Sequence, residues 1–252
     1  MLYHEMWGQH LRLGNFLFKY AWSIAKKEQF GIPTVYPDYY LWQHLKHPPL
    51  ISNEVKGEML RPIKWEYSKE EEILVNNILK DSVRNNTDVQ VALNFFFQSE
   101  KWFENYKDQV WKSLQFKDEV VRDIEIKYQE IFNAPTIGIG IRLGDFIKHG
   151  DFYQIDPDWY ISALLSQPFW SNYNVVIFSD DIEMAKEIFK EYNFFYAEPN
   201  GTHTHADNFS HYHKDASEQF ILGTMMDNWI IGNSTFSWFQ AWIAEQNSLH
   251  ST

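Results

Sequence analysis

The chain has 252 residues, a formal net charge of -12 and no cysteine. A sequence pI near 5.2 argues against nucleic acid or an anionic membrane as the main partner, because both attract basic surfaces. Without cysteine there is no disulfide framework, no thiol nucleophile and no thiolate metal site. A hydrophobic share of 44% is enough for one large domain or for two small lobes with their own cores.

The sequence gives no sign of a membrane segment or a secretory signal. No stretch reaches the roughly 18 apolar residues that a spanning helix needs. Residues 1–15 are polar and charged where a signal peptide would be apolar. We therefore expect a soluble, cytoplasmic protein.

The first half of the chain carries mixed signals, with little periodicity in the Pro- and aromatic-rich residues 37–62. Asn15 is a candidate cap for the first helix, which Gly31 ends, and Ser68 begins a capping box for the second. The predicted elements are a helix over 16–30, a strand over 34–36, a helix over 68–79, a strand over 89–97 and an amphipathic helical region over 101–132.

The second half alternates regularly between strands and helices. Asp156, followed by Pro157, caps the first of its helices. The predicted elements are strands over 136–141, 174–178, 193–197 and 228–232, and helices over 156–165, 182–192, 215–226 and 235–245. This alternation predicts a parallel sheet with helices on both faces.

Polar side chains follow three of these strands. They are Arg142 and Asp145; Ser179, Asp180 and Asp181; and Asn233, Ser234 and Thr235. Ligands of open α/β sheets bind outside the carboxyl ends of the strands, so we expect the three groups to converge on one crevice. An arginine, a carboxylate pair and a hydroxyl-bearing helix start suit a nucleoside diphosphate.

Each group has an assigned role and a simpler alternative. Arg142 can contact phosphates through two parallel hydrogen bonds, or it can be a solvated arginine at a strand end. Ser234 and Thr235 open a helix whose free N–H groups favour an anion, and a helix cap there is compatible with phosphate binding. Asp180 or Asp181 can accept hydrogen bonds from guanine or ribose, although at least one of them is expected to be a helix cap.

Five segments match a known family. Residues 12–21 (RLGNFLFKYA), 97–103 (FQSEKWF), 178–181 (FSDD) and 229–243 (WIIGNSTFSWFQAWI) stand where the family has GLGNQMFQYA, FQSEKYF, FSDD and NIIANSTFSWWGAWL. Residues 140–145 (GIRLGD) match H-x-R-R-x-D incompletely, with Gly140 at the His position and Leu143 at the second Arg position. In this order and spacing the set resembles glycosyltransferase family 11, the α-1,2-fucosyltransferase group.

The resemblance implies an α/β fold of the GT-B type with two Rossmann-like lobes. Residues 1–133 would form the N-terminal lobe on the acceptor side, and residues 134–252 the C-terminal lobe, which would hold most of the nucleotide-sugar site. The implied reaction transfers fucose from GDP-fucose to a glycan hydroxyl with inversion and without a metal or other cofactor. Gly14 and Asn15 of the opening segment would join the donor site.

Two catalytic roles follow from the resemblance. Arg142 would grip the donor diphosphate, and Asp145 would take the proton of the attacking hydroxyl or would orient Arg142 as a salt-bridge partner. The departures at Gly140 and Leu143 leave two alternatives open. The chain could use a different donor, or it could bind a nucleotide or glycan without turning it over.

Two further features have an open interpretation. The four histidines between His203 and His213 could bind Zn²⁺ or Ni²⁺, could border the nucleotide, or could simply face solvent. Exposed aromatic side chains of the first half would stack against acceptor sugars. The candidates are Trp7, Tyr39, Tyr40 and Trp42.

Overall fold

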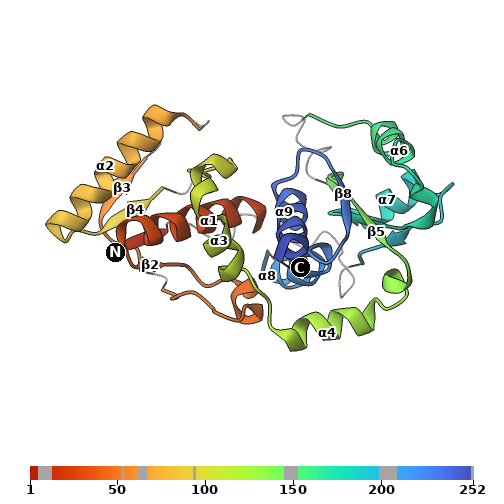
Figure 1. Cartoon of the computed structure of the whole chain (residues 1–252), viewed down its shortest axis with the longest axis horizontal. Coiled ribbons are helices and arrows are strands. Elements are labelled where there is room, and N and C mark those ends of the chain that lie inside the picture. The colour runs from red at the N-terminus through yellow and green to blue at the C-terminus, as the bar shows by residue number, and fades with distance from the viewer. Residues whose placement is uncertain are drawn as a thin grey trace. The chain divides into compact units, whose positions relative to one another are not determined.

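The computed structural model describes residues 1–4, 13–52, 54–61, 67–92, 95–144, 153–198 and 209–250. The chain forms two compact units, residues 1–117 and most of residues 118–252. Each unit contains one four-stranded sheet in which all paired strands are parallel (Figure 1). The units divide between Lys117 and Asp118, earlier than the predicted boundary at 133/134, because helix α4 (Asp118–Lys127) belongs to the second unit.

The N-terminal unit has the sheet order β2-β1-β4-β3. Strands β2 and β4 and helices α1 and α2 fall where the sequence predicts elements, whereas β1 and β3 have no counterpart among the predicted strands. The elements are β1 (Leu2–His4), α1 (Leu13–Phe30), β2 (Thr34–Val35), η2 (Tyr40–His44), β3 (Glu58–Leu60), α2 (Lys69–Asn85), β4 (Val89–Val91), η3 (Glu100–Trp102), η4 (Glu104–Tyr106) and α3 (Lys107–Ser113).

Helix α1 forms the core of this unit. Most of its residues are buried, and its aromatic side chains pack with the ring of His4 in β1 and with rings that follow β2 and β4, namely Tyr36, Trp42 and Phe97. Asn15 lies inside α1, so the prediction that it caps the helix is wrong. Ser68 does cap α2, since its side chain accepts a hydrogen bond from the Glu71 N–H at 3.1 Å.

The C-terminal unit has the sheet order β7-β6-β5-β8. Its strands occupy the predicted positions, and Asp156 caps α6 by accepting a hydrogen bond from the Asp158 N–H at 3.0 Å. The elements after α4 are η5 (Ile131–Asn133), β5 (Thr136–Ile141), α6 (Pro157–Leu165), η6 (Trp170–Asn172), β6 (Asn174–Ser179), α7 (Ile182–Ile188), β7 (Phe195–Tyr196), α8 (Phe209–Gly223), β8 (Asn228–Ile231) and α9 (Thr235–His250).

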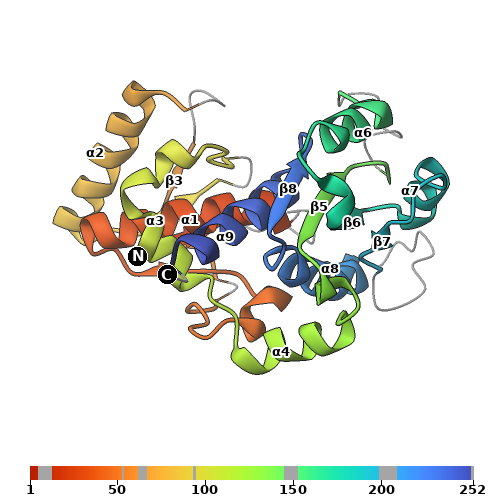
Figure 2. The same cartoon turned by 45° about the vertical axis from the view of Figure 1, so that its right-hand side comes forward.

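The alternation of isoleucine and glycine in β5 explains how helices cover both faces of this sheet. Ile137, Ile139 and Ile141 join a buried cluster that includes side chains of α6 and α7. On the opposite face, a Cβ at Gly140 would lie 2.6 Å from the Cβ of Ser237 in α9, so this helix packs against the bare backbone of the strand. Figure 2 shows α6 and α7 on one side of the strands and α8 and α9 on the other.

Some predicted helices have different limits in the structure. The region 101–132 is broken into α3, α4 and short 3-10 turns, whereas α9 continues five residues beyond the predicted end, from 245 to His250. Among the described residues, none of the helices combines the length and the apolar character needed to cross a membrane.

Candidate functional site

The carboxyl ends of the central strands in the C-terminal unit bring the predicted groups together. Strand β5 lies between β6 and β8, with Ile141 paired to Ser179 and Gly140 paired to Ile231. The next residues along β5 and β6 are Arg142 and Asp180. The chain proceeds from β5 to β6 and β7 on one side, whereas β8 lies on the other side of β5, so a topological switch point lies between β5 and β8. The adjacent parallel strands β6, β5 and β8 therefore end at one edge of the sheet, and the convergence of the three groups on one crevice stays a prediction.

Arg142 is held at this edge by a buried carboxylate. Its Nη2 lies 3.2 Å from Oδ2 of Asp180, and the two side chains are 14% and 7% exposed. The other oxygen of Asp180, Oδ1, accepts the backbone N–H groups of Leu143 at 2.9 Å and Gly144 at 3.2 Å. Asp180 therefore binds both the guanidinium and the turn that carries it.

The turn after β5 accommodates this carboxylate because residue 144 is glycine. A Cβ at Gly144 would lie 2.9 Å from Oδ2 of Asp180, closer than real Cβ contacts come. The carboxylate and the backbone at Gly144 could not keep this approach with a larger residue.

The start of α9 lies at the same edge of the sheet. Ser234 is its cap, with the side-chain oxygen accepting the Ser237 N–H at 3.4 Å and the carbonyl accepting the Trp238 N–H at 2.9 Å. Ser237, in the first turn of α9, packs on Gly140, two residues before Arg142. The positive end of the helix dipole and the guanidinium thus flank one strand end, which suits an anion.

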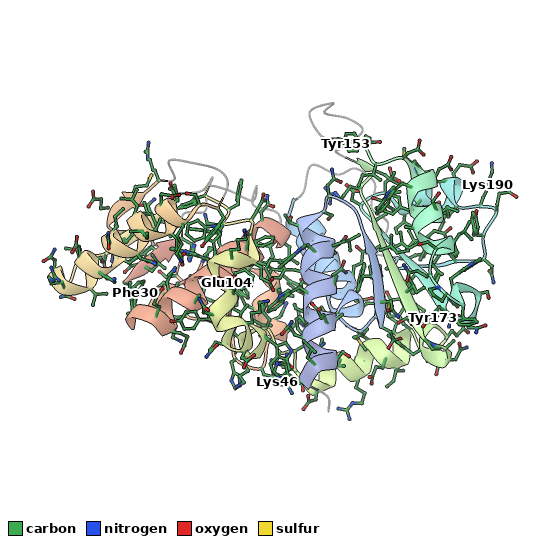
Figure 3. The ribbon with its side chains drawn as sticks, turned by 45° about the horizontal axis from the view of Figure 1, so that its top comes forward. Phe30, Lys46, Glu104, Tyr153, Tyr173 and Lys190 are labelled. Atoms are coloured by element: carbon green, nitrogen blue, oxygen red, sulfur yellow. The ribbon has the colours of Figure 1, made fainter. Side chains whose placement is uncertain are left out.

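Asn233 links this edge to the segment before α6. Its Nδ2 donates a hydrogen bond to the carbonyl oxygen of Tyr153 at 2.9 Å. Tyr153 and Tyr173, labelled in Figure 3, mark opposite ends of the sheet, since Tyr173 directly precedes β6. The Tyr153 side chain is 79% exposed beside the edge that carries Arg142.

Asp181 is a helix cap. Its Oδ1 accepts the Met184 N–H at 3.1 Å at the start of α7, and its own N–H donates to Ser179 Oγ at 3.1 Å. Of the two adjacent carboxylates, Asp181 thus caps a helix, as expected for at least one of them, whereas Asp180 contacts Arg142.

The predicted donor contacts of the N-terminal unit lie at the start of α1. Gly14 is buried there, and Oδ1 of Asn15 accepts a hydrogen bond from Gln98 Nε2 at 2.8 Å, which joins two of the family-like segments. Tyr39 and Trp42 are 6% and 1% exposed and pack against Phe16, so neither is an exposed platform for an acceptor sugar.

Three predictions fall outside the described residues. Asp145 and Trp7 are not described, nor are the side chains between His203 and His213. Over the described ranges, no group of three or more His, Asp or Glu side chains could hold a metal ion.

The two departures from the family motif have structural reasons. The space beside Gly140 is filled by Ser237 of α9, so a histidine there would collide with the helix. Leu143 is 3% exposed and belongs to the apolar cluster between the sheet and helices α6 and α7. Neither residue offers a polar side chain at the site, and Arg142 is the arginine that the motif retains.

Comparison with known proteins places the chain in a family. A model of glycosyl transferase family 11 matches residues 63–250. The O-antigen biosynthesis glycosyltransferase WbnK of Escherichia coli is 26% identical over an alignment of 206 residues, and the match covers 78% of this chain and 63% of the length of WbnK.

Solved fucosyltransferases share the fold. The structure of NodZ from Bradyrhizobium aligns with a TM-score of 0.57 and 12% identity, over 95% of this chain and 91% of NodZ. POFUT1 in complex with GDP-fucose aligns with a TM-score of 0.58 and 9% identity, over 96% of this chain and 93% of POFUT1. The α/β fold with two parallel sheets, the edge that presents Arg142 and the match over residues 63–250 lead to one conclusion: this chain belongs to glycosyl transferase family 11.

Proposed function

We propose that this enzyme transfers fucose from GDP-fucose to a glycan hydroxyl, with inversion, without a metal and with an α-1,2 linkage. In this proposal the two units are the lobes of a GT-B enzyme, and the C-terminal unit holds most of the donor. Structures of NodZ and POFUT1 were determined with GDP-fucose, which supports this donor for a chain of the same fold.

The observation that carries the proposal is the placement of Arg142. Its guanidinium is largely buried against Asp180 at the carboxyl end of β5, the strand on which the first turn of α9 packs at Gly140. A diphosphate bound there would receive charge-assisted hydrogen bonds from Arg142 and from the helix start at Ser234 and Thr235. In an acidic protein with a net charge of -12, such a local cation is the feature that would select an anionic donor.

The same groups would stabilise the transition state. As the sugar carbon leaves the phosphate oxygen, negative charge grows on GDP, and Arg142 and the α9 dipole would neutralise it as a metal ion does in other transferases. The bond from the acceptor oxygen to the sugar carbon forms on the opposite face, and the acceptor proton passes to a carboxylate, for which we propose Asp145. We assign Gly14, Asn15, Asn233 and Asp181 to the supporting backbone and polar contacts of the donor site.

A second candidate function is transfer from a different nucleotide sugar. It is favoured by Gly140 and Leu143, because the first is covered by Ser237 and the second is buried among apolar side chains. The site thus lacks a histidine and an arginine that the family motif has, and these could contribute to donor choice.

The experiment is a transfer assay with a panel of GDP-sugars and UDP-sugars, run with and without EDTA. We expect activity with GDP-fucose that survives EDTA, a product whose anomeric configuration by NMR is opposite to that of the donor, and a loss of at least 100-fold in Arg142→Ala. Activity with another sugar only would favour the second function. Turnover that requires a divalent ion would contradict the metal-free site.

A further inference from the structure

We infer that Asp180 is a positioning residue that fixes Arg142 for the donor diphosphate, rather than a contact to the guanine or the ribose. The inference builds on the proposed function, since it assigns a role within that donor site. It follows from the three contacts of a single carboxylate at the carboxyl ends of β5 and β6.

Both oxygens of Asp180 are used within the chain. Oδ2 pairs with the Arg142 guanidinium at 3.2 Å, and Oδ1 accepts the N–H groups of Leu143 and Gly144. At 7% exposure the side chain has little surface to offer to a ligand. A carboxylate that read guanine would have to give up these hydrogen bonds, which is costly for a buried charge.

The geometry explains why the arginine needs a partner. An unrestrained arginine side chain loses rotamer entropy when it is fixed. In this site that entropy is lost on folding, because Asp180 pairs with the guanidinium and also binds the backbone of Leu143 and Gly144, which restricts Arg142 before any ligand binds. Two N–H donors and one guanidinium also offset the negative charge of Asp180, which limits its repulsion of a phosphate.

Asp227 provides a matched control at the opposite edge of the same sheet. Its Oδ2 accepts hydrogen bonds from the N–H and the hydroxyl of Thr136, both at 2.8 Å, where β5 begins. It therefore fixes β5 by the same chemistry but at the amino end, away from Arg142. Asp227→Asn should lower thermal stability and leave the donor site intact.

The first test measures the mobility of Arg142 without any ligand. The chain has five arginines, so the Nε–Hε signal of Arg142 can be assigned in ¹⁵N NMR by comparison with Arg142→Lys. We expect a rigid side chain in the unmodified protein and in Asp227→Asn, and a mobile one in Asp180→Asn. Equal mobility in the unmodified protein and Asp180→Asn would overturn the inference whether or not GDP binds, so its failure is distinct from that of the proposed function.

The second test is a cycle of GDP titrations. Asp180→Asn should weaken GDP binding about tenfold, which is within the range of coupling between contacting groups. In the Arg142→Ala background the same substitution should leave GDP binding unchanged or improve it, because an unpaired carboxylate then faces the phosphates. If Asp180 contacted guanine or ribose, the substitution would weaken binding by a similar factor in both backgrounds, and this result would overturn the inference.

Gly144→Ala separates geometry from charge. It keeps both charges but places a Cβ 2.9 Å from Oδ2 of Asp180, so the carboxylate must shift away from its present position. We expect a mobile Arg142 and weaker GDP binding, as in Asp180→Asn. An unchanged Arg142 signal in a folded Gly144→Ala protein would contradict the positioning role.

Discussion

The close packing of α9 on Gly140 can be tested by adding one methyl group. In Gly140→Ala the new Cβ would lie 2.6 Å from Ser237 Cβ, whereas ordinary contacts between such atoms begin near 3.4 Å. The Ser237 Cβ is fixed to the helix backbone, so α9 must move by roughly 1 Å. Overpacking of this kind costs about 1–3 kcal/mol, and we expect the upper end because a helix and not a side chain has to shift.

Thermal unfolding measures this cost. For a chain of this size about 3 kcal/mol corresponds to a fall in Tm of about 6–12 °C. Gly138→Ala is the control, because the three atoms nearest to its Cβ would belong to the Trp229 ring, at 2.9 Å, and this side chain can tilt, so we expect a smaller loss. Adding Ser237→Gly to Gly140→Ala should recover part of the lost stability. The packing argument is refuted if Gly140→Ala is no less stable than Gly138→Ala, or if Ser237→Gly recovers nothing.

Two further predictions concern buried bases of the N-terminal unit. Burial lowers the pKa of Lys26 to about 8, and Glu72 partly compensates for this effect. Below pH 8 the folded protein bears the full cost of a buried charge. Between pH 8 and 10.5 the folded protein binds fewer protons than the unfolded chain, so the free energy of unfolding rises with pH. Lys26→Met should raise the free energy of unfolding in urea by up to about 3 kcal/mol at pH 7, and it should abolish the increase in stability between pH 8 and 10.5. A variant that is less stable than the unmodified protein at pH 7 would contradict the prediction. Burial, and secondarily Lys19, lowers the pKa of His4 well below its usual 6.5, so stability should fall as the pH drops below 6.5. His4→Phe can keep the stacking on Tyr36 and should lose less stability than the unmodified protein as the pH falls below 6.5 in acid denaturation. An unchanged dependence of stability on pH would show that other groups cause the loss.

The C-terminal unit could be predicted from the sequence because its signals are local. Apolar runs of four to six residues, each followed by polar residues and a helix, gave every strand from β5 to β8. The parallel order of such strands places their carboxyl ends at one edge, and so the position of Arg142, Asp180 and Ser234 at the same edge was predictable in outline.

The N-terminal sheet was harder to predict for a physical reason. Strands β1 and β3 have three residues each, too few for alternation to show, whereas β4, which is equally short, lies in the longer apolar run of residues 89–97. The prediction for Asn15 failed because the residue type favours a helix cap, whereas Asn15 lies within α1. There its side chain accepts a hydrogen bond from Gln98. The contact between Asp180 and Arg142 was not predicted from the sequence. It depends on the register of β5 with β6, and neither segment alone specifies that register.

Calorimetric titration of the protein with GDP, in the presence of EDTA, tests the donor site most directly. We predict binding that survives EDTA and that weakens by about 2 kcal/mol or more in Arg142→Ala, the scale expected when a charged hydrogen-bonding partner is lost. Asp227→Asn should bind GDP like the unmodified protein. An absence of GDP binding, or equal affinity in Arg142→Ala, would contradict the assignment of this strand edge as the donor site.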